Sequence, residues 1–285
     1  MTQASGRPAV VGEAIFVDEI GIEIGVYGAY RLKSAYQPIF ARVGDFMRPV
    51  AVKGLISPFL SGKPVLASEF FDKIPAHDAL FVEGMCRALH LRNHHNIGAD
   101  GLDLFFNYAP GANCDLEKSL LEIGFMVRRL NEIGLDPKQL VCEISDADAI
   151  DADVLQTLSL AMRGHGVRIA VDGFGVGDTT ERQVELIQPD VVKIDGSWFR
   201  KVCLETAAIR LFGQLVSGLR IGGAKVLVEG IEDDDQLTIA LAAGADLFQG
   251  FHLGRPALAG TVFDESPRAL PKPRPSTGVV VPLFA

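Results

Sequence analysis

The sequence lacks the features that mark membrane, secreted and disulfide-rich proteins. Its 285 residues contain no uninterrupted apolar run of the roughly 18 residues that a membrane-spanning helix needs. The amino-terminal stretch lacks the basic-then-apolar order of a secretory signal. The four cysteines are far apart and form no CxxC pair, which favours neither a disulfide framework nor a cysteine zinc site. We therefore expect a cytoplasmic protein with no direct membrane insertion.

An excess of basic charge is also missing. The chain carries 27 lysine and arginine residues against 36 aspartate and glutamate residues, a formal net charge of −9. Such a chain repels nucleic-acid backbones, so we expect no nucleic-acid partner. Apolar residues make up 48% and charged residues 22% of the chain, which is typical of a folded globular protein and excludes a disordered or coiled-coil chain.

Short apolar, β-branched runs alternate with longer stretches of helical periodicity, which indicates an α/β fold. From the third run onward the separations leave room for the crossover helices that parallel strands require. The gap between the first two runs contains Gly44 and Pro49 and suits a hairpin, so these two strands are expected to be antiparallel. We predict a (β/α)₈ TIM-like barrel with one antiparallel strand near the start; an open doubly wound sheet is the alternative. The expected strands are Ala35–Phe40, Val50–Leu55, Leu102–Asn107, Leu140–Ile144, Arg168–Val171, Val191–Ile194, Lys225–Val228 and Leu247–Gln249.

Most of these strands end in a polar residue that a core strand should avoid. In a barrel, such residues meet at the carboxyl-terminal rim, where barrel enzymes build their active sites. A helix cap or a satisfied amide explains any one of them alone, but not all of them in phase. Carboxylates and an amide oxygen suit Mg²⁺ or Mn²⁺, and such ions act on phosphate esters. The residues are Asn107, Glu143, Asp172, Lys193, Glu229 and Gln249.

Seven ordered motifs between about Tyr30 and Pro256 resemble the EAL-type cyclic-di-GMP phosphodiesterase domain. They are YQPI, NYAP, EISD, VDGFGVGD, KID, VEGIE and FQGFHLGRP. The resemblance implies a TIM-like barrel over residues 30–265, with residues 1–29 as an N-terminal extension and 266–285 as a proline-rich C-terminal tail. Residues 9–29 alternate like an added hairpin that closes the bottom of the barrel or pairs with another chain.

The resemblance also implies roles for single residues. Metal ligands would be an asparagine, a glutamate and two adjacent aspartates, together with a glutamate of the first motif. A lysine and a later glutamate would position the attacking water, and other side chains would contact the ligand. On this chain the metal ligands are Asn107, Glu143 and Asp172, the water-positioning pair is Lys193 and Glu229, and the ligand-binding positions are Gln37, Lys53, Ser57 and Gln249.

This sequence departs from the family pattern at three of those positions. The segment AVKGLISP places Lys53 at the metal-ligating glutamate and Ser57 at a phosphate-binding arginine, and a shift by one residue places Val52 there and restores no carboxylate. Asp172 is followed by Gly173 and not by a second aspartate. The remaining ligands predict at most one weakly bound Mg²⁺ or Mn²⁺, or no metal at all. We hypothesise that the Lys53 ammonium replaces the metal; the alternative is that Lys53 leans out to solvent.

Three functions remain open. A degenerate EAL domain without hydrolytic activity would bind cyclic-di-GMP, a bacterial second messenger, as a regulatory module in signal transduction. A weak or active phosphodiesterase would hydrolyse it to pGpG. A protein-interaction module would bind no nucleotide. In each case a protein partner or a homodimer is the expected route of output, and the segment after Asp172 is expected to be either a mobile loop or an ordinary turn. Its residues are Gly173, Gly175, Gly177 and Asp178.

Overall fold

The computed structural model describes residues 10–108, 115–144, 150–176 and 181–271. Its centre is a closed barrel of eight strands, in which the first strand pairs with both the second and the last. The predicted barrel is therefore confirmed, and the open doubly wound sheet is excluded. The barrel strands are β3 (Tyr30–Val43), β4 (Phe46–Leu60), β6 (Asp103–Tyr108), β7 (Leu140–Ile144), β8 (Arg168–Phe174), β9 (Val191–Ile194), β10 (Lys225–Val228) and β11 (Leu247–Phe248).

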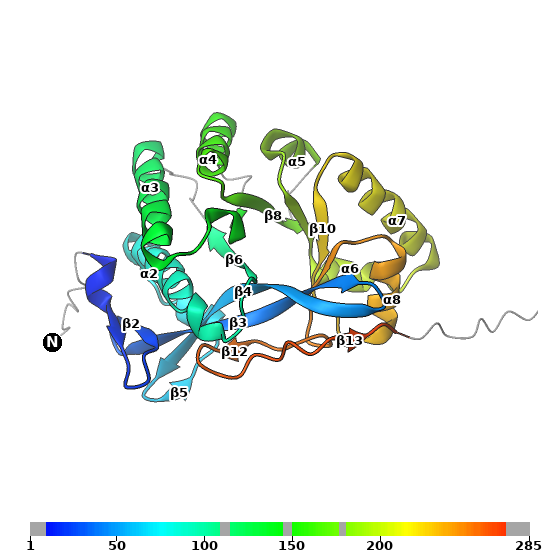
Figure 1. The fold of residues 1–285 in the computed structure, drawn as a ribbon. Coiled ribbons are helices and arrows are strands. Elements are labelled where there is room, and N and C mark those ends of the chain that lie inside the picture. Colours follow the sequence, from blue (N-terminus) through cyan, green and yellow to red (C-terminus); the bar gives the residue numbers. More distant parts are fainter. Residues whose placement is uncertain (1–9, 109–114, 145–149, 177–180, 272–285) are drawn as a thin grey trace, which may run out of the picture.

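Strand direction follows the lengths of the connections. β3 runs antiparallel to β4 and β11, as the short gap after β3 predicts, and the other neighbouring barrel strands run parallel. Helices that follow the parallel strands lie outside the barrel (Figure 1), because a crossover connection must return the chain to the same end of the sheet. They are α3 (Leu116–Ile133), α4 (Ala152–Gly164), α5 (Glu181–Ile187), α6 (Gly196–Val202), α7 (Thr206–Ile221) and α8 (Asp234–Ala242).

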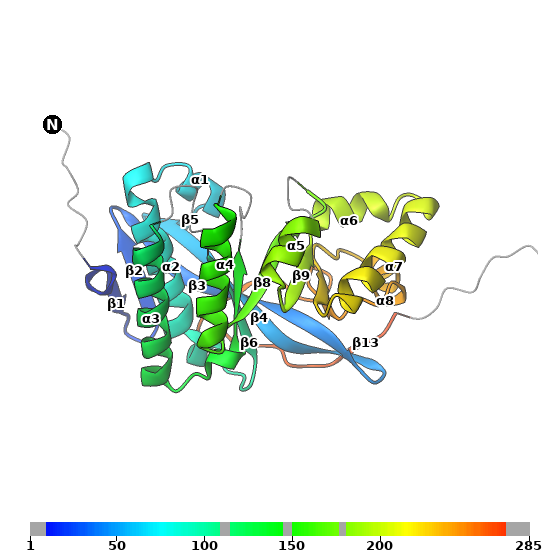
Figure 2. The same cartoon turned by 90° about the horizontal axis from the view of Figure 1, so that it is seen from above.

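The long hairpin of β3 and β4 extends past the barrel at both ends (Figures 1 and 2). Near Tyr30 it meets β2 (Glu23–Tyr27), which forms a hairpin with β1 (Ile15–Val17). Because β4 runs parallel to β6, this end of the hairpin lies with the carboxyl ends of the barrel strands. The added hairpin therefore does not close the barrel bottom, and that expectation was wrong.

Five further strands and helices lie outside this set in the described residues. β5 (Lys63–Pro64) pairs with β4 and is followed by α1 (Ala67–Phe71) and α2 (Ala79–Arg92), while β12 (Ala257–Leu258) pairs with β3. β13 (Arg268–Ala269) pairs with β4 at the other end of the hairpin. Residues 266–271 of the expected tail are thus placed on the surface, and residues 272–285 lie outside the described part of the chain. None of the helices formed by the described residues is both long and apolar enough to cross a membrane.

A buried histidine links α2 to the hairpin. His90 is 5% exposed, and its Nδ1 lies 3.0 Å from the Ser34 hydroxyl. A Cβ at Gly54 would lie 2.7 Å from the ring of His90, so glycine at this position allows the ring to pack directly on β4. Burial lowers the pKa of His90 to about 4, which keeps the ring neutral near pH 7.

Acid should therefore weaken the fold through His90. Its pKa falls on folding from 6.5 to about 4, so the unfolded chain takes up a proton first, and stability falls as pH drops through this window by about 1.4 kcal/mol per pH unit. We expect urea unfolding of His90→Asn to be less steeply pH-dependent than wild type between pH 6 and pH 4. Equal slopes for the two proteins would contradict this assignment.

Candidate functional site

The inward direction of the polar side chains at the rim follows from the alternation of side chains along each strand, in which every second side chain points to the same face. The barrel interior is filled by one apolar residue from each strand, such as Val141 and Val191. Side chains two positions apart share a face of a strand, so Glu143 and Lys193 take the same inward direction one layer higher. β3 runs antiparallel to its neighbours, so the order is reversed there: the polar Gln37 comes two positions before the apolar interior residue Ile39. The polar layer consists of Gln37, Lys53, Asn107, Glu143, Asp172, Lys193, Glu229 and Gln249.

Lys193 is the centre of this layer. Its side chain is fully buried, and its Nζ lies 2.6 Å from Glu143 Oε2, 2.9 Å from Asp172 Oδ1 and 2.9 Å from Glu229 Oε1. Asp172 and Glu229 reach it from β8 and from the end of β10, the two strands beside β9. Burying charges is tolerated only when each is paired, and one ammonium here pairs with three carboxylates.

Lys53 adds a second ammonium. Its Nζ lies 2.8 Å from Glu143 Oε2 and 3.9 Å from Glu229 Oε1, and its side chain is 12% exposed. Lys53 therefore points into the site and not out to solvent. Glu143 Oε2 thus accepts hydrogen bonds from two ammonium groups at once, while Glu143 Oε1 is buried without a hydrogen-bond partner in the described part of the protein.

Burial and the close approach of ammonium and carboxylate groups shift the pKa values of Lys193, Asp172 and Glu229. Burial alone would lower the pKa of Lys193, but Glu143, Glu229 and Asp172 hold it well above its ordinary value. Burial would raise the pKa of Asp172, but Lys193 and Lys53 hold it below its ordinary value. Burial raises the pKa of Glu229, which the two lysines only partly oppose. Both ends of the Lys193–Asp172 pair are therefore charged at neutral pH.

Two glutamines close the layer on the other side. Gln249 donates its Nε2 hydrogen to Gln37 Oε1 at 3.0 Å, and Gln37 donates to the Gly254 carbonyl at 3.1 Å. Gln249 Oε1 is buried and has no hydrogen-bond partner among the described residues. A buried amide oxygen without a partner is costly, so this atom is an acceptor available to a ligand.

Asn107 lies beside the carboxylates and borders a cavity. It is exposed, and its Cα pairs with that of Glu143 in the β6–β7 ladder. The cavity next to it measures about 290 Å³ and lies between β4, α1 and α2. The sequence did not predict this space; its one signal is Gly54, whose missing side chain lets His90 pack against β4 in the wall of the cavity.

The segment after Asp172 is only partly described. Gly173 ends the regular part of β8 with a φ of 74°, and Gly175 has a φ of 102°. A Cβ on Gly175 would lie 2.6 Å from the ring of Trp198, so this glycine allows the segment to pack on the indole. Gly177 and Asp178 lie outside the described residues.

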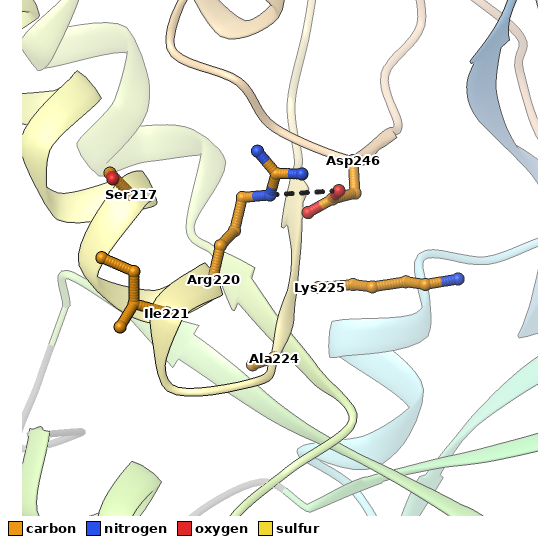
Figure 3. A pocket seen from close by; sticks show the side chains of 6 residues that line it. All are labelled: Ser217, Arg220, Ile221, Ala224, Lys225 and Asp246. Carbon is orange, nitrogen blue, oxygen red and sulfur yellow. Dashed lines mark ion pairs between the residues drawn. The ribbon is translucent and has the colours of Figure 1, made fainter.

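Another cavity lies at the opposite end of the barrel. It measures about 430 Å³ and is built around the ion pair of Arg220 and Asp246, 3.3 Å apart (Figure 3). Lys225, the first residue of β10, lines it and extends away from that pair. The amino ends of the strands form this end, so the cavity is separate from the polar layer.

The donor set at the rim does not fit a divalent ion as it stands. Two ammonium groups already occupy Glu143 Oε2, and Lys193 also holds Asp172 and Glu229. Across the described residues, no group of three or more histidine, cysteine, aspartate or glutamate side chains is placed to hold a metal ion. The expected ligands Asn107, Glu143 and Asp172 therefore form no metal centre here without movement of a lysine.

The matching family model decides the classification of this barrel. The model of the EAL domain matches residues 69–256, more than half of the chain. The chain belongs to the EAL domain family. The resemblance seen in the motifs is thus confirmed, and the chain carries an EAL domain related to cyclic-di-GMP phosphodiesterases.

Individual EAL proteins are also similar to this chain in sequence. The cyclic di-GMP phosphodiesterase PdeL of Escherichia coli is 25% identical over 135 residues, which cover 47% of this chain and 37% of that protein. The chain spans less than half the length of such curated relatives.

Solved EAL structures share the fold. Bacillus subtilis YkuI, solved with its substrate c-di-GMP and calcium, gives a TM-score of 0.69 at 24% identity and covers 82% of this chain and 57% of that one. Klebsiella pneumoniae BlrP1, solved with manganese and cyclic di-GMP, gives a TM-score of 0.71 at 24% identity, over 81% and 57% of the two chains.

Proposed function

We propose that this EAL domain binds cyclic-di-GMP as a signal and does not hydrolyse it. The observation that carries the proposal is the Lys53 ammonium 2.8 Å from Glu143 Oε2, inside the carboxylate cluster. A cation is needed among these buried acids, and the chain supplies its own. The relatives PdeL and YkuI, described as a phosphodiesterase and as a complex with substrate c-di-GMP, support the choice of ligand.

The ammonium replaces the charge of a metal ion but not its chemistry. A divalent ion lowers the pKa of a bound water so that hydroxide is present at neutral pH. An ammonium is a hydrogen-bond donor only, so it neither binds a water as a Lewis acid nor generates hydroxide. Lys53 and Lys193 therefore stabilise the carboxylates while leaving no activated nucleophile.

The rest of the site suits a nucleotide. Gln249 Oε1 is an acceptor without a partner in the described structure, and a guanine edge carries N–H donors. The cavity of about 290 Å³ beside Asn107 is lined in part by the apolar side chains Leu55, Phe71 and Ile56, which can pack on a base. Binding without cleavage would transmit a signal by favouring one conformation. The segment from Gly173 to Gly175 is the element beside the site that could report it to a second copy or another protein.

Calorimetry with cyclic-di-GMP tests the proposal. We expect the same affinity in Mg²⁺ and in excess chelator, and no pGpG after long incubation. Lys225→Met, which removes a lysine at the opposite end of the barrel, should bind like wild type. Slow hydrolysis that rises with Mn²⁺ would show a weak phosphodiesterase instead. Absence of binding in every condition would show a domain that acts through protein contacts alone.

A further inference from the structure

β3 and β4 continue beyond the barrel and form a wall past the carboxyl ends of its parallel strands (Figure 1). In their ladder Gln37 pairs with Lys53, and four residues farther out Lys33 pairs with Ser57. Residues separated by an even number of positions share a face of a strand. Lys33 and Ser57 therefore stand on the same face as Lys53, which points into the site.

Lys33 is a cation held over an aromatic ring. Its Nζ lies 5.5 Å from the centre of the Phe59 ring, and the residue is half-buried. No carboxylate in the described part of the chain forms an ion pair with it. An ammonium over an aromatic face keeps its charge and its hydrogen-bond donors for another group.

The charges of the cluster at the rim do not themselves neutralise an anionic ligand, so binding needs a further cation such as Lys33. Lys53 and Lys193 supply two positive charges against the three carboxylates Glu143, Asp172 and Glu229. Those two ammonium groups therefore have no surplus charge for an anionic ligand. A dianionic ligand that binds without metal ions must be neutralised by a group outside the cluster, and Lys33 stands on the wall that leads out of it.

We propose that Lys33 binds a phosphodiester group of the ligand. Its partner in the β3–β4 ladder, Ser57, carries no charge. This inference rests on the proposed function. The Cβ atoms of directly paired residues on neighbouring strands lie about 4.5–5.5 Å apart, so the Ser57 hydroxyl and the Lys33 ammonium can contact the same phosphate. Hydrogen bonds between an ammonium and a phosphate are charge-assisted and stronger than neutral ones.

Calorimetry on Lys33→Gln tests this assignment. We expect affinity for cyclic-di-GMP in excess chelator to fall at least about tenfold, and the salt dependence of binding to become weaker. Arg42→Gln is the matched control, because it removes one cation from the same strand near the barrel bottom, where Arg42 bonds the nearby Gly44 carbonyl. Its affinity should stay within about twofold of wild type.

Exchange of the two paired residues separates a binding role from a structural one. In Lys33→Ser with Ser57→Lys the ammonium moves to the opposite member of the same rung, and we expect affinity to return to within about threefold of wild type. If wild type binds and Lys33→Gln binds equally well, the role of Lys33 is wrong while the proposed function stands. If wild type does not bind cyclic-di-GMP at all, the role of Lys33 and the proposed function are both wrong.

Discussion

Lys53→Glu combined with Gly173→Asp is expected to produce metal-dependent hydrolysis of cyclic-di-GMP, at least about a hundredfold above wild type in Mg²⁺ or Mn²⁺. The first change removes the ammonium that lies 2.8 Å from Glu143 and replaces it with a carboxylate. The second adds a carboxylate beside Asp172. Gly173 has a φ of 74°, a region in which aspartate is among the better tolerated residues, at a cost of about 1–2 kcal/mol. Chromatography of the linear product over time measures the gain.

A control variant and a second measurement sharpen this experiment. Lys225→Glu makes the same change of charge at the exposed first residue of β10, at the opposite end of the barrel, and should gain no activity. A thermal shift with Mn²⁺ should appear in the double variant and not in wild type, because only the variant offers a cation site. The idea that Lys53 stands in for a metal fails if wild type already turns over as fast as the double variant.

The barrel was predictable because its strands obey one simple pattern. An apolar residue that fills the interior is followed two positions later by a polar one, as in Val141 and Glu143. The true length of β3 and β4 was not predicted: the sequence indicated Ala35–Phe40 and Val50–Leu55, whereas the strands run over Tyr30–Val43 and Phe46–Leu60. Outside the barrel one face of the hairpin meets solvent, so charged residues such as Arg31, Lys33 and Arg42 interrupt the apolar pattern there.

The members of the site were predictable but their pairing was not. Lys53 was expected among Glu143 and Asp172; it contacts Glu143, while Asp172 is held by Lys193. The sequence shows which strand carries each charge, but the contact depends on strand order around the barrel and on side-chain reach. The period of two also places Lys33 on the face of Gln37, but only the ladder pairing of Lys33 with Ser57 shows that the two share a rung.

Lys193→Met is expected to destabilise the protein by about 3–5 kcal/mol at pH 7, because one partner of a buried ion cluster is removed. Methionine approximates the length of the lysine stem but leaves Glu143, Asp172 and Glu229 without the ammonium that lies within 2.9 Å of each. The Lys53 ammonium contacts Glu143 at 2.8 Å but lies 3.9 Å from Glu229, so it compensates only in part. Urea unfolding of the two proteins measures the difference.

The size of this loss should depend on pH in a defined direction. The pKa of Lys193 is raised on folding, so its contribution is fully present at neutral and acidic pH and is lost only as pH rises through that raised pKa. In Lys193→Met the unpaired carboxylates take up protons as pH falls, which removes the buried charge, so the deficit should shrink between pH 7 and pH 5. Lys225→Met, at an exposed position of the neighbouring strand, should change stability by less than about 0.5 kcal/mol. A Lys193→Met protein as stable as wild type at pH 7 would show that the carboxylates are not charged around this lysine.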